Sequence, residues 1–120
     1  MNQCCIFIMS YELAAKKDQE LQKHNFNMCI ADETHYLKSR DTKRSKALVP
    51  ILQQSKRVLL LSGTPVLAKP CEIYNILKII RPDICPSWMD FSQRYCDPKD
   101  TRYGKDYSGA TCTKELHYLL

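Results

Sequence analysis

Residues 26–35 read FNMCIADETH, an apolar run that ends in two acids, a hydroxyl and an imidazole. Two further apolar runs lie at residues 4–9 and 58–61. Continuous runs of this length, in which apolar and polar residues do not alternate, are typical of parallel strands covered on both faces by helices. We therefore expect a parallel sheet of about three strands, formed by residues 4–9, 26–31 and 58–61.

Helical segments are predicted between and after these strands. Ser10 can cap a helix that extends to about His24, with Glu12 near its electropositive end. A second helix is predicted over residues 42–55, with a kink or a restart at Pro50. Pro70 is expected to open a third, which ends at residues 81–82 and carries on one face Ile73, Ile76, Leu77 and Ile80. Strands that alternate with helices indicate an α/β fold.

The remaining residues extend this unit. We divide the chain into two parts. Residues 1–82 form the α/β part, and residues 83–120 form a helical and loop extension of the same folded unit. Within the extension, residues 88–96 and 114–120 are predicted to be helical. Residues 97–113 are polar and lack periodicity, which indicates either a functional insertion or disorder.

Composition bounds the class of protein. A chain of 120 residues with 44% hydrophobic and 26% charged residues is typical of one soluble globular domain with a single core. Its apolar runs are far shorter than the roughly 20 residues of a membrane-spanning helix, so we expect no membrane contact. The seven cysteines are odd in number and contain no C-x-x-C spacing, which argues against a disulfide framework, a zinc site and a thiol enzyme.

The net charge of +5 is concentrated between residues 38 and 57, where seven basic residues accompany one acid. This block is either a solvated helix face or a surface that contacts phosphates. The sequence pattern leaves both interpretations open.

Ligands of open parallel sheets bind beyond the carboxyl ends of the strands. Asp32 and Glu33 follow the second run, and the turn Ser62-Gly63-Thr64-Pro65 follows the third. An acid at such a strand end can hold Mg²⁺ on nucleotide phosphates, while a neighbouring carboxylate polarises the attacking water. Each segment alone is more often an ordinary loop or turn. Together they predict that the acids and the hydroxyl turn are neighbours at one edge of the sheet.

These two segments resemble motifs II and III of superfamily 2 nucleic-acid translocases, in particular the Snf-type DNA-dependent ATPases. Residues 9–13, MSYEL, resemble the strand-to-helix junction that those proteins carry before motif II. The stretch VLAKP at 66–70, together with RYC at 94–96 and DYSG at 106–109, is similar to the annealing-helicase branch, the HARP-like proteins. The resemblance covers the chain from about residue 4 to its end and implies part of the first RecA-like lobe.

The resemblance also implies roles for individual residues. Asp32 would bind Mg²⁺ and Glu33 would be the catalytic carboxylate. The state of the bound ATP would be coupled to DNA by His35, Ser62, Gly63 and Thr64. Phosphates of DNA would be contacted by Arg40, Lys43, Arg44 and Lys69, of which Lys69 could equally be a plain surface charge. Thr34 replaces the serine that is more usual in motif II.

Two parts of such an enzyme do not occur in these residues. No G-x-x-x-x-G-K-[ST] loop is present to cradle phosphates. The second RecA-like lobe, with its arginine finger, is not present either. We therefore expect the 120 residues alone neither to bind ATP tightly nor to hydrolyse it. A G-x-G-K-T type loop encoded upstream would distinguish part of an enzyme from the alternative, a non-catalytic remnant that binds DNA or protein.

The family resemblance further implies ATP as cofactor, branched or junction DNA at stalled replication forks as partner, and the nucleus as location. Four aromatic residues near the C-terminus could either stack on bases or pack the extension onto the lobe, namely Trp88, Tyr95, Tyr103 and Tyr107.

Overall fold

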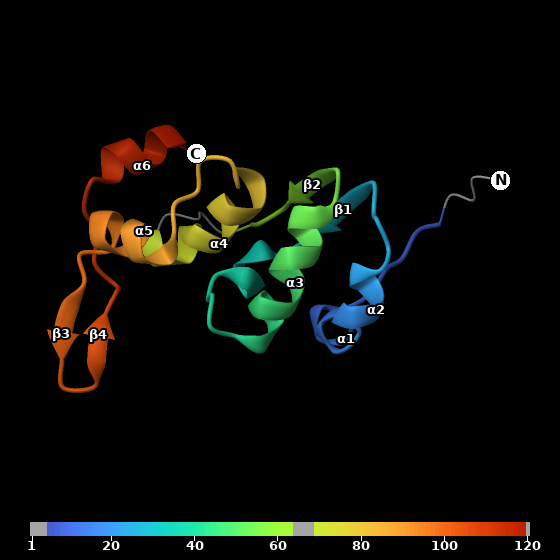
Figure 1. Ribbon diagram of the computed structural model, residues 1–120, viewed down its shortest axis with the longest axis horizontal. Helices are drawn as coiled ribbons and strands as arrows, with labels where there is room; N and C mark the ends of the chain where they lie inside the picture. Colours follow the sequence, from blue (N-terminus) through green and yellow to red (C-terminus); the bar gives the residue numbers. More distant parts are fainter. Residues whose placement is uncertain (1–4, 64–68, 120) are drawn as a thin grey trace.

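The computed structural model describes residues 5–63 and 69–119. In chain order its elements are α1 (Tyr11–Lys16), α2 (Asp18–Gln22), β1 (Met28–Ala31), the 3-10 helix η1 (Thr34–Leu37), α3 (Lys43–Gln54), β2 (Arg57–Leu60), α4 (Pro70–Ile80), α5 (Trp88–Tyr95), β3 (Lys99–Thr101), β4 (Gly104–Asp106) and α6 (Thr113–Leu119). The molecule is elongated, 55 × 31 × 26 Å, and Figure 1 shows α1 and α2 toward one end of the long axis and β3 and β4 at the other.

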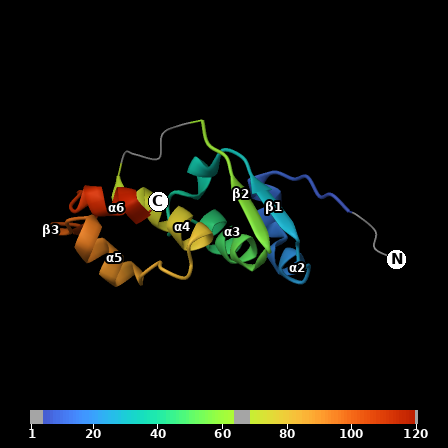
Figure 2. The same ribbon diagram turned by 90° about the horizontal axis from the view of Figure 1, so that it is seen from above.

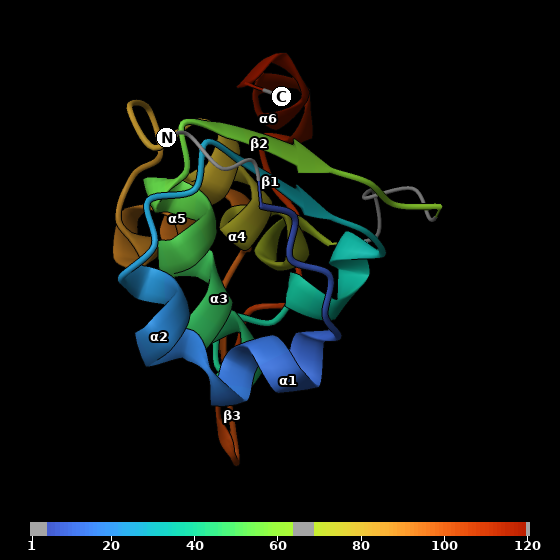
Figure 3. The same cartoon turned by 90° about the vertical axis from the view of Figure 1, so that its right-hand side faces the viewer.

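The strands β1 and β2 form a parallel pair, with Met28 opposite Arg57 and Ala31 opposite Leu60. Helices α1, α2 and α3 lie on one face of this pair (Figure 3). Apolar side chains of these helices, together with residues of β1, η1 and α4, form the sheet cluster, whose buried members are Ala14, Leu21, Ala31, Leu37, Leu48, Val49, Ile51, Leu52 and Ile79. This βαβ arrangement confirms the mixed α/β class and is compatible with part of a RecA-like lobe.

The predicted third parallel strand is not formed. Within the described chain the parallel sheet has two strands, and residues 5–9 adopt no strand. Phe7 instead packs against the rings of His24 and Phe26, with ring centroids 5.5 and 5.8 Å apart. The neighbouring side chains of Ile6 and Ile8 remain exposed. Aromatic contacts, and not a strand ladder, therefore hold this segment.

The other face of the sheet is apolar and open to solvent. Its exposed side chains are Met28, Ile30, Leu59 and Leu61, while the alternate residues of both strands pack toward the helices. The expectation that both faces are covered is wrong for this face.

Local sequence accounts for the helix boundaries. The Ser10 hydroxyl accepts a hydrogen bond from the N–H of Leu13 at 3.2 Å, so the predicted cap of α1 is confirmed. The helix expected up to about His24 is divided at Lys17, whose backbone leaves the helical region. Helix α3 runs through Pro50 without the predicted restart. Pro50 lies on the exposed face, where water can satisfy the carbonyl that its missing N–H leaves unpaired, while buried neighbours hold the helix on the sheet.

Helix α4 begins at Pro70 as predicted. Its buried face differs from the expected stripe, because Tyr74 and Ile79 are buried whereas Ile80 is 39% exposed. Together with α5 and α6 it forms the aromatic cluster, whose buried members are Ile73, Tyr74, Leu77, Phe91, Tyr95, Cys96 and Leu116. Asn75 joins the two clusters, since its side-chain amide donates to the buried carbonyl of Leu37 at 2.7 Å.

Part of the stretch 97–113, which was expected to be either a functional insertion or disordered, has regular structure. Residues 99–106 form an antiparallel β-hairpin, β3 and β4, that projects from the base of α5 and α6. The predicted helices at 88–96 and 114–120 correspond to α5 and α6. Figure 2 also places α6 and β3 at the end of the molecule away from β1 and α2. None of the helices in the described ranges is long and apolar enough to cross a membrane.

Candidate functional site

Asp32 lies at the carboxyl end of β1, where the chain leaves the sheet. Its carboxylate Oδ1 accepts a hydrogen bond from the backbone N–H of Glu33 at 2.9 Å, and its side chain is exposed. The hydroxyl of Tyr11 donates to the Asp32 carbonyl oxygen at 2.5 Å. The backbone at Asp32 is thus fixed from α1, while its carboxylate faces solvent beside the strand end.

Glu33 adopts a left-handed backbone conformation, with φ 53° and ψ 54°. For a residue with a Cβ this conformation costs about 1–3 kcal/mol and is maintained only by its surroundings. The turn directs the Glu33 carboxylate toward His35, whose Nδ1 lies 3.1 Å from Oε2. Nδ1 is shielded from water, but the pair lacks hydrogen-bond geometry. The two side chains therefore lie close together without a hydrogen bond between them.

The acidic strand end and the turn after β2 are directly connected through Leu61. The Leu61 N–H donates to the Ala31 carbonyl at 2.8 Å, and the Leu61 carbonyl accepts from the Thr34 N–H at 2.9 Å. Thr34 is buried, with 2% of its surface exposed. The prediction that these two strand ends are neighbours at one edge of the sheet is confirmed.

The turn itself is described only in part. Ser62 follows Leu61 at this edge, whereas Thr64 lies outside the described residues. The φ of Gly63 is not in the left-handed region, and among the described residues a Cβ there would meet nothing within 4 Å.

The residues at this edge could hold a divalent cation through Asp32. Mg²⁺ is commonly bound by one or two carboxylates together with phosphates and waters, so a single exposed carboxylate at a strand end fits this role. The described residues contain no group of three or more acids, histidines or cysteines that would form a complete protein cage. Any Mg²⁺ at Asp32 would therefore take its other ligands from outside this set of described residues.

Two tyrosines that sequence reasoning did not single out connect this site to α3. Tyr11 lies against Tyr36 at 5.6 Å between ring centroids, and the guanidinium of Arg44 lies 4.9 Å above the Tyr36 ring. Partial burial, followed by the negative charge of Asp32, raises the pKa of Tyr11, so its hydroxyl keeps the proton that it donates. The sequence signal was the position of Tyr11 directly after the Ser10 cap, beyond an apolar run.

The four predicted DNA-contacting residues do not form one patch. Arg40 lies 4.3 Å above the ring of Trp88 and 3.8 Å from the Asp41 carboxylate, and so bridges toward α5. Lys43 and Arg44 occupy the first turn of α3, which contains no acid. Lys69 precedes α4 and is exposed. Two of the four cations thus lie together at the N-terminus of α3, and two lie elsewhere.

A family model and individual relatives all assign this chain to the same family. The SNF2-related domain matches residues 1–120. The SWI/SNF-related matrix-associated actin-dependent regulator of chromatin subfamily A-like protein 1 of Xenopus laevis is 44% identical over 115 residues, which is 96% of this chain and 12% of that protein. The human DNA annealing helicase and endonuclease ZRANB3 is 40% identical over 104 residues, 83% of this chain and 10% of that protein.

A more distant relative is similar over the same region. The Caenorhabditis elegans homolog of the first protein is 34% identical over 115 residues and is covered to 17% of its length. The chain therefore spans less than a fifth of the curated relatives that it matches. With the two motif segments joined at one sheet edge and a family match over all 120 residues, this chain belongs to the SNF2-related family.

Proposed function

We propose that this chain forms part of the ATP-binding lobe of an ATP-dependent DNA translocase of the annealing-helicase type. The observation that carries the proposal is the backbone connection of the two strand ends through Leu61, with bonds of 2.8 and 2.9 Å to Ala31 and Thr34. This connection brings the acids of one segment and the hydroxyl turn of the other to one edge, as a nucleotide site of this class requires.

In this proposal Asp32 holds Mg²⁺ and Glu33 orients the attacking water. Mg²⁺ would neutralise charge that develops on the phosphates of ATP. The left-handed turn at Glu33 directs the two neighbouring carboxylates differently, so that one can serve the metal and the other the nucleophile. His35 lies 3.1 Å from the Glu33 carboxylate and would restrain its orientation. Ser62, Gly63 and Thr64 would respond to the state of the phosphates.

The positive charge on α3 supports DNA as the second ligand. Lys43 and Arg44 lie in the first turn of the helix, where unpaired N–H groups and the helix dipole also favour an anion. Cations at this end oppose the dipole and slightly destabilise the helix in isolation, an effect that a bound phosphate would remove. Arg44 also contacts Tyr36, which contacts Tyr11, whose hydroxyl binds the Asp32 backbone. These contacts give DNA binding a physical route to the proposed ATP site.

The relatives support the choice of reaction and location. One is named a regulator of chromatin and another a DNA annealing helicase and endonuclease. We propose that the native protein acts in the nucleus on branched DNA or on junctions between single and double strands, such as those at stalled replication forks. The phosphate-binding loop and a second lobe would be supplied outside these residues.

The test is DNA-stimulated ATP hydrolysis by the native polypeptide that contains these residues. Glu33→Gln keeps the shape and removes the carboxylate, and should lower kcat at least about 100-fold, as expected for loss of a catalytic acid or base. Glu20→Gln, an exposed acid on α2, is the matched control and should keep full activity. Equal hydrolysis by the two variants would contradict the proposal and favour a non-catalytic binding module. The same assay on residues 1–120 alone should show no turnover.

The proposed DNA interface is tested separately, by the salt dependence of DNA binding. Replacement of Arg40, Lys43 and Arg44 by Ala in the native polypeptide should reduce the slope of log affinity against log salt. The expected reduction is about 0.9 for each duplex phosphate that the variant no longer neutralises. An unchanged salt slope would remove these three residues from the DNA interface.

A further inference from the structure

The structure separates the four C-terminal aromatic residues that sequence reasoning treated together. Trp88 packs against Tyr74 at 5.1 Å and against Tyr107 at 5.3 Å between ring centroids, and Tyr95 is buried beside Phe91. Tyr103 differs from all three, because 93% of its surface is exposed. Packing of the extension onto the lobe therefore accounts for three of the four rings and leaves Tyr103 without a structural role.

Tyr103 lies in the turn of the β-hairpin, whose body is electrically balanced. Lys99 stands opposite Asp106 and Asp100 opposite Lys105 in the antiparallel register. Cross-strand pairs of opposite charge stabilise such a hairpin, which is otherwise marginal as two strands alone. Arg102 is in the turn and has no acid opposite it; among the described residues it takes part in no ion pair of 4 Å or less. The uncompensated charge of the hairpin is thus next to its exposed ring.

The turn that carries Arg102 and Tyr103 is fixed by its own hydrogen bonds. The Thr101 hydroxyl donates to the Gly104 carbonyl at 2.5 Å and accepts from the Tyr103 N–H at 3.3 Å. Gly104 adopts φ 116°, a conformation that side chains with a Cβ rarely adopt. A turn held in this way presents its two side chains with little backbone entropy left to lose on binding.

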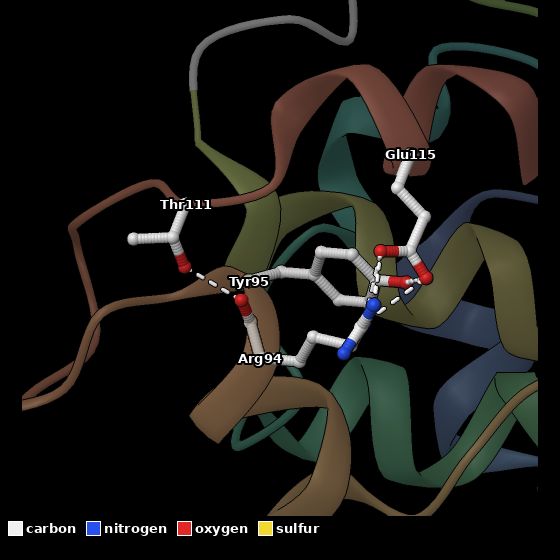
Figure 4. A network of polar contacts seen from close by, with 4 residues as sticks. All are labelled: Arg94, Tyr95, Thr111 and Glu115. Atoms are coloured by element: carbon white, nitrogen blue, oxygen red, sulfur yellow. Dashed lines mark hydrogen bonds and ion pairs between the residues drawn. The ribbon is translucent and has the colours of Figure 1, made fainter.

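The base of the hairpin is anchored in the aromatic cluster. Arg94 of α5 forms a hydrogen-bonded ion pair with Glu115 of α6, and the Tyr95 hydroxyl donates to the same carboxylate at 3.1 Å (Figure 4). The Thr111 hydroxyl donates to the Arg94 carbonyl at 2.5 Å. Gly109 passes so close to α5 that a Cβ there would lie 2.9 Å from the Cys96 carbonyl oxygen. Both ends of the hairpin are therefore held, and its tip projects from a fixed support.

We propose that the hairpin tip is a DNA-contacting element, in which Tyr103 stacks on an unpaired base beside a single-strand to double-strand junction and Arg102 contacts an adjacent phosphate. This inference rests on the proposed function and adds a site to it, at the end of the molecule away from α1 and α2 (Figure 1). An exposed ring and an unpaired guanidinium on a neutral support match a base face next to a phosphate.

The small size of the tip favours DNA over a protein partner. A stable protein interface buries about 800 Å² on each side around a packed apolar centre. The hairpin strands carry only polar, charged and glycine residues, all of them exposed, so Tyr103 is the one large apolar group of the hairpin. Stacking on a base requires no apolar surroundings, because every base offers a flat π face of matching size.

The test compares variants of the native polypeptide that contains residues 1–120, on a forked DNA and on a blunt duplex of the same sequence. Binding is followed by anisotropy, and a 2-aminopurine at the first unpaired position reports stacking through its fluorescence. Tyr103→Ala should weaken fork binding by about 5- to 150-fold, the range for removal of one base stack, and should abolish the 2-aminopurine quenching. Tyr103→Phe should bind within about twofold of the unchanged protein, because it retains the ring.

Two controls make the comparison specific. Tyr118 on α6 is similarly exposed, at 91%, and Tyr118→Ala should leave fork binding unchanged. Arg102→Gln should weaken fork binding and lower its salt slope by about 0.7 for one single-strand phosphate. Melting followed by circular dichroism should be the same for every variant.

The outcomes separate this inference from the proposed function. If Tyr103→Ala binds the fork as tightly as Tyr118→Ala does, the hairpin contact is overturned. DNA-stimulated ATP hydrolysis is a separate measurement, so the proposed function would still stand. Equal losses on fork and blunt duplex would also overturn it, because a ring cannot stack on a base that remains paired within the helix. Absence of any DNA binding by the unchanged protein would overturn both proposals.

Discussion

The sheet cluster and the aromatic cluster bury apolar surface in different ways. Each contains a fully buried side chain, Leu37 of η1 in the sheet cluster and Phe91 of α5 in the aromatic cluster. Around Phe91, aromatic neighbours surround the core, with Tyr74, Tyr95 and Trp88 at 5.1, 5.0 and 6.2 Å between ring centroids. The sheet, in contrast, is packed on one face and presents apolar side chains to water on the other. The residues with the motif chemistry therefore belong to the less enclosed half of the molecule.

This difference indicates which half determines stability. Apolar surface removed from water is the main favourable contribution to folding, at roughly 25 cal/mol per Å². A sheet covered on one face gains only part of this contribution from its side chains. We infer that the aromatic cluster supports the fold of these residues, and that the two strand ends depend on it through contacts such as the bond from Asn75 to the Leu37 carbonyl, 2.7 Å. Three predictions test this inference.

The largest effect is expected for Phe91→Ala. Phe91 has 0% exposure, and removal of its ring leaves a cavity among rings that cannot collapse fully, so unfolding should become easier by about 3–5 kcal/mol. Chemical denaturation followed by the fluorescence of Trp88 measures this directly. Met89→Ala, on the same helix but 64% exposed, is the control and should change stability by about 0.5 kcal/mol or less. A small effect at Phe91 would mean that the aromatic cluster is not the supporting half.

An intermediate effect is expected from alkaline pH on the same cluster. Burial raises the pKa of the Cys96 thiol to about 11, from its ordinary value of 9.0. The folded state holds this proton more tightly than the unfolded state, so the stabilisation is fully present below pH 9 and is lost as the pH rises toward 11. The free energy of unfolding should fall across this window, and Cys96→Ala should show a shallower fall. Parallel curves for the two proteins would contradict burial of Cys96.

The smallest effect is expected on the open face of the sheet. Ile30 is 61% exposed, so Ile30→Thr, which keeps a β-branched side chain, should change the free energy of unfolding by about 0.5 kcal/mol or less. Ile51→Thr, beneath the same sheet at 6% exposure, should cost about 2 kcal/mol or more because it buries a hydroxyl and loses apolar packing. Equal losses at both positions would show that both faces of the sheet are covered.

Sequence reasoning succeeded where local chemistry determines structure. The predictable features were the Ser10 cap, the start of α4 at Pro70 and the two strands β1 and β2. Each follows from propensity or from a continuous apolar run. The adjacency of the acids and the hydroxyl turn was predictable for the same reason. Parallel strands joined by a helix necessarily end at the same edge.

Sequence reasoning failed where contacts between residues distant in the sequence determine the structure. The run at residues 4–9 has the composition of a strand, but Phe7 packs on His24 and Phe26 instead of pairing along β1. Residues 99–106 carry no apolar alternation, so their hairpin depends on charge pairs that are recognisable only once the register is known. Tyr11 could be placed next to Asp32 only after α1 was seen to pack beneath the strand end. The roles of the acids in ATP hydrolysis and of the cations in DNA binding stay predictions.

The double use of Leu61 has a consequence for how this family member should be studied. Both main-chain groups of that one residue are engaged by the opposite segment, the amide by Ala31 and the carbonyl by Thr34. The amide and the carbonyl belong to the two successive peptide units that flank the Leu61 Cα, so a movement of either segment can reach the other through the backbone of this one residue, whatever side chains surround it. Alanine scanning leaves both peptide units intact and would overlook the communication, whereas an ester in place of the Thr34 amide would remove the donor and interrupt it.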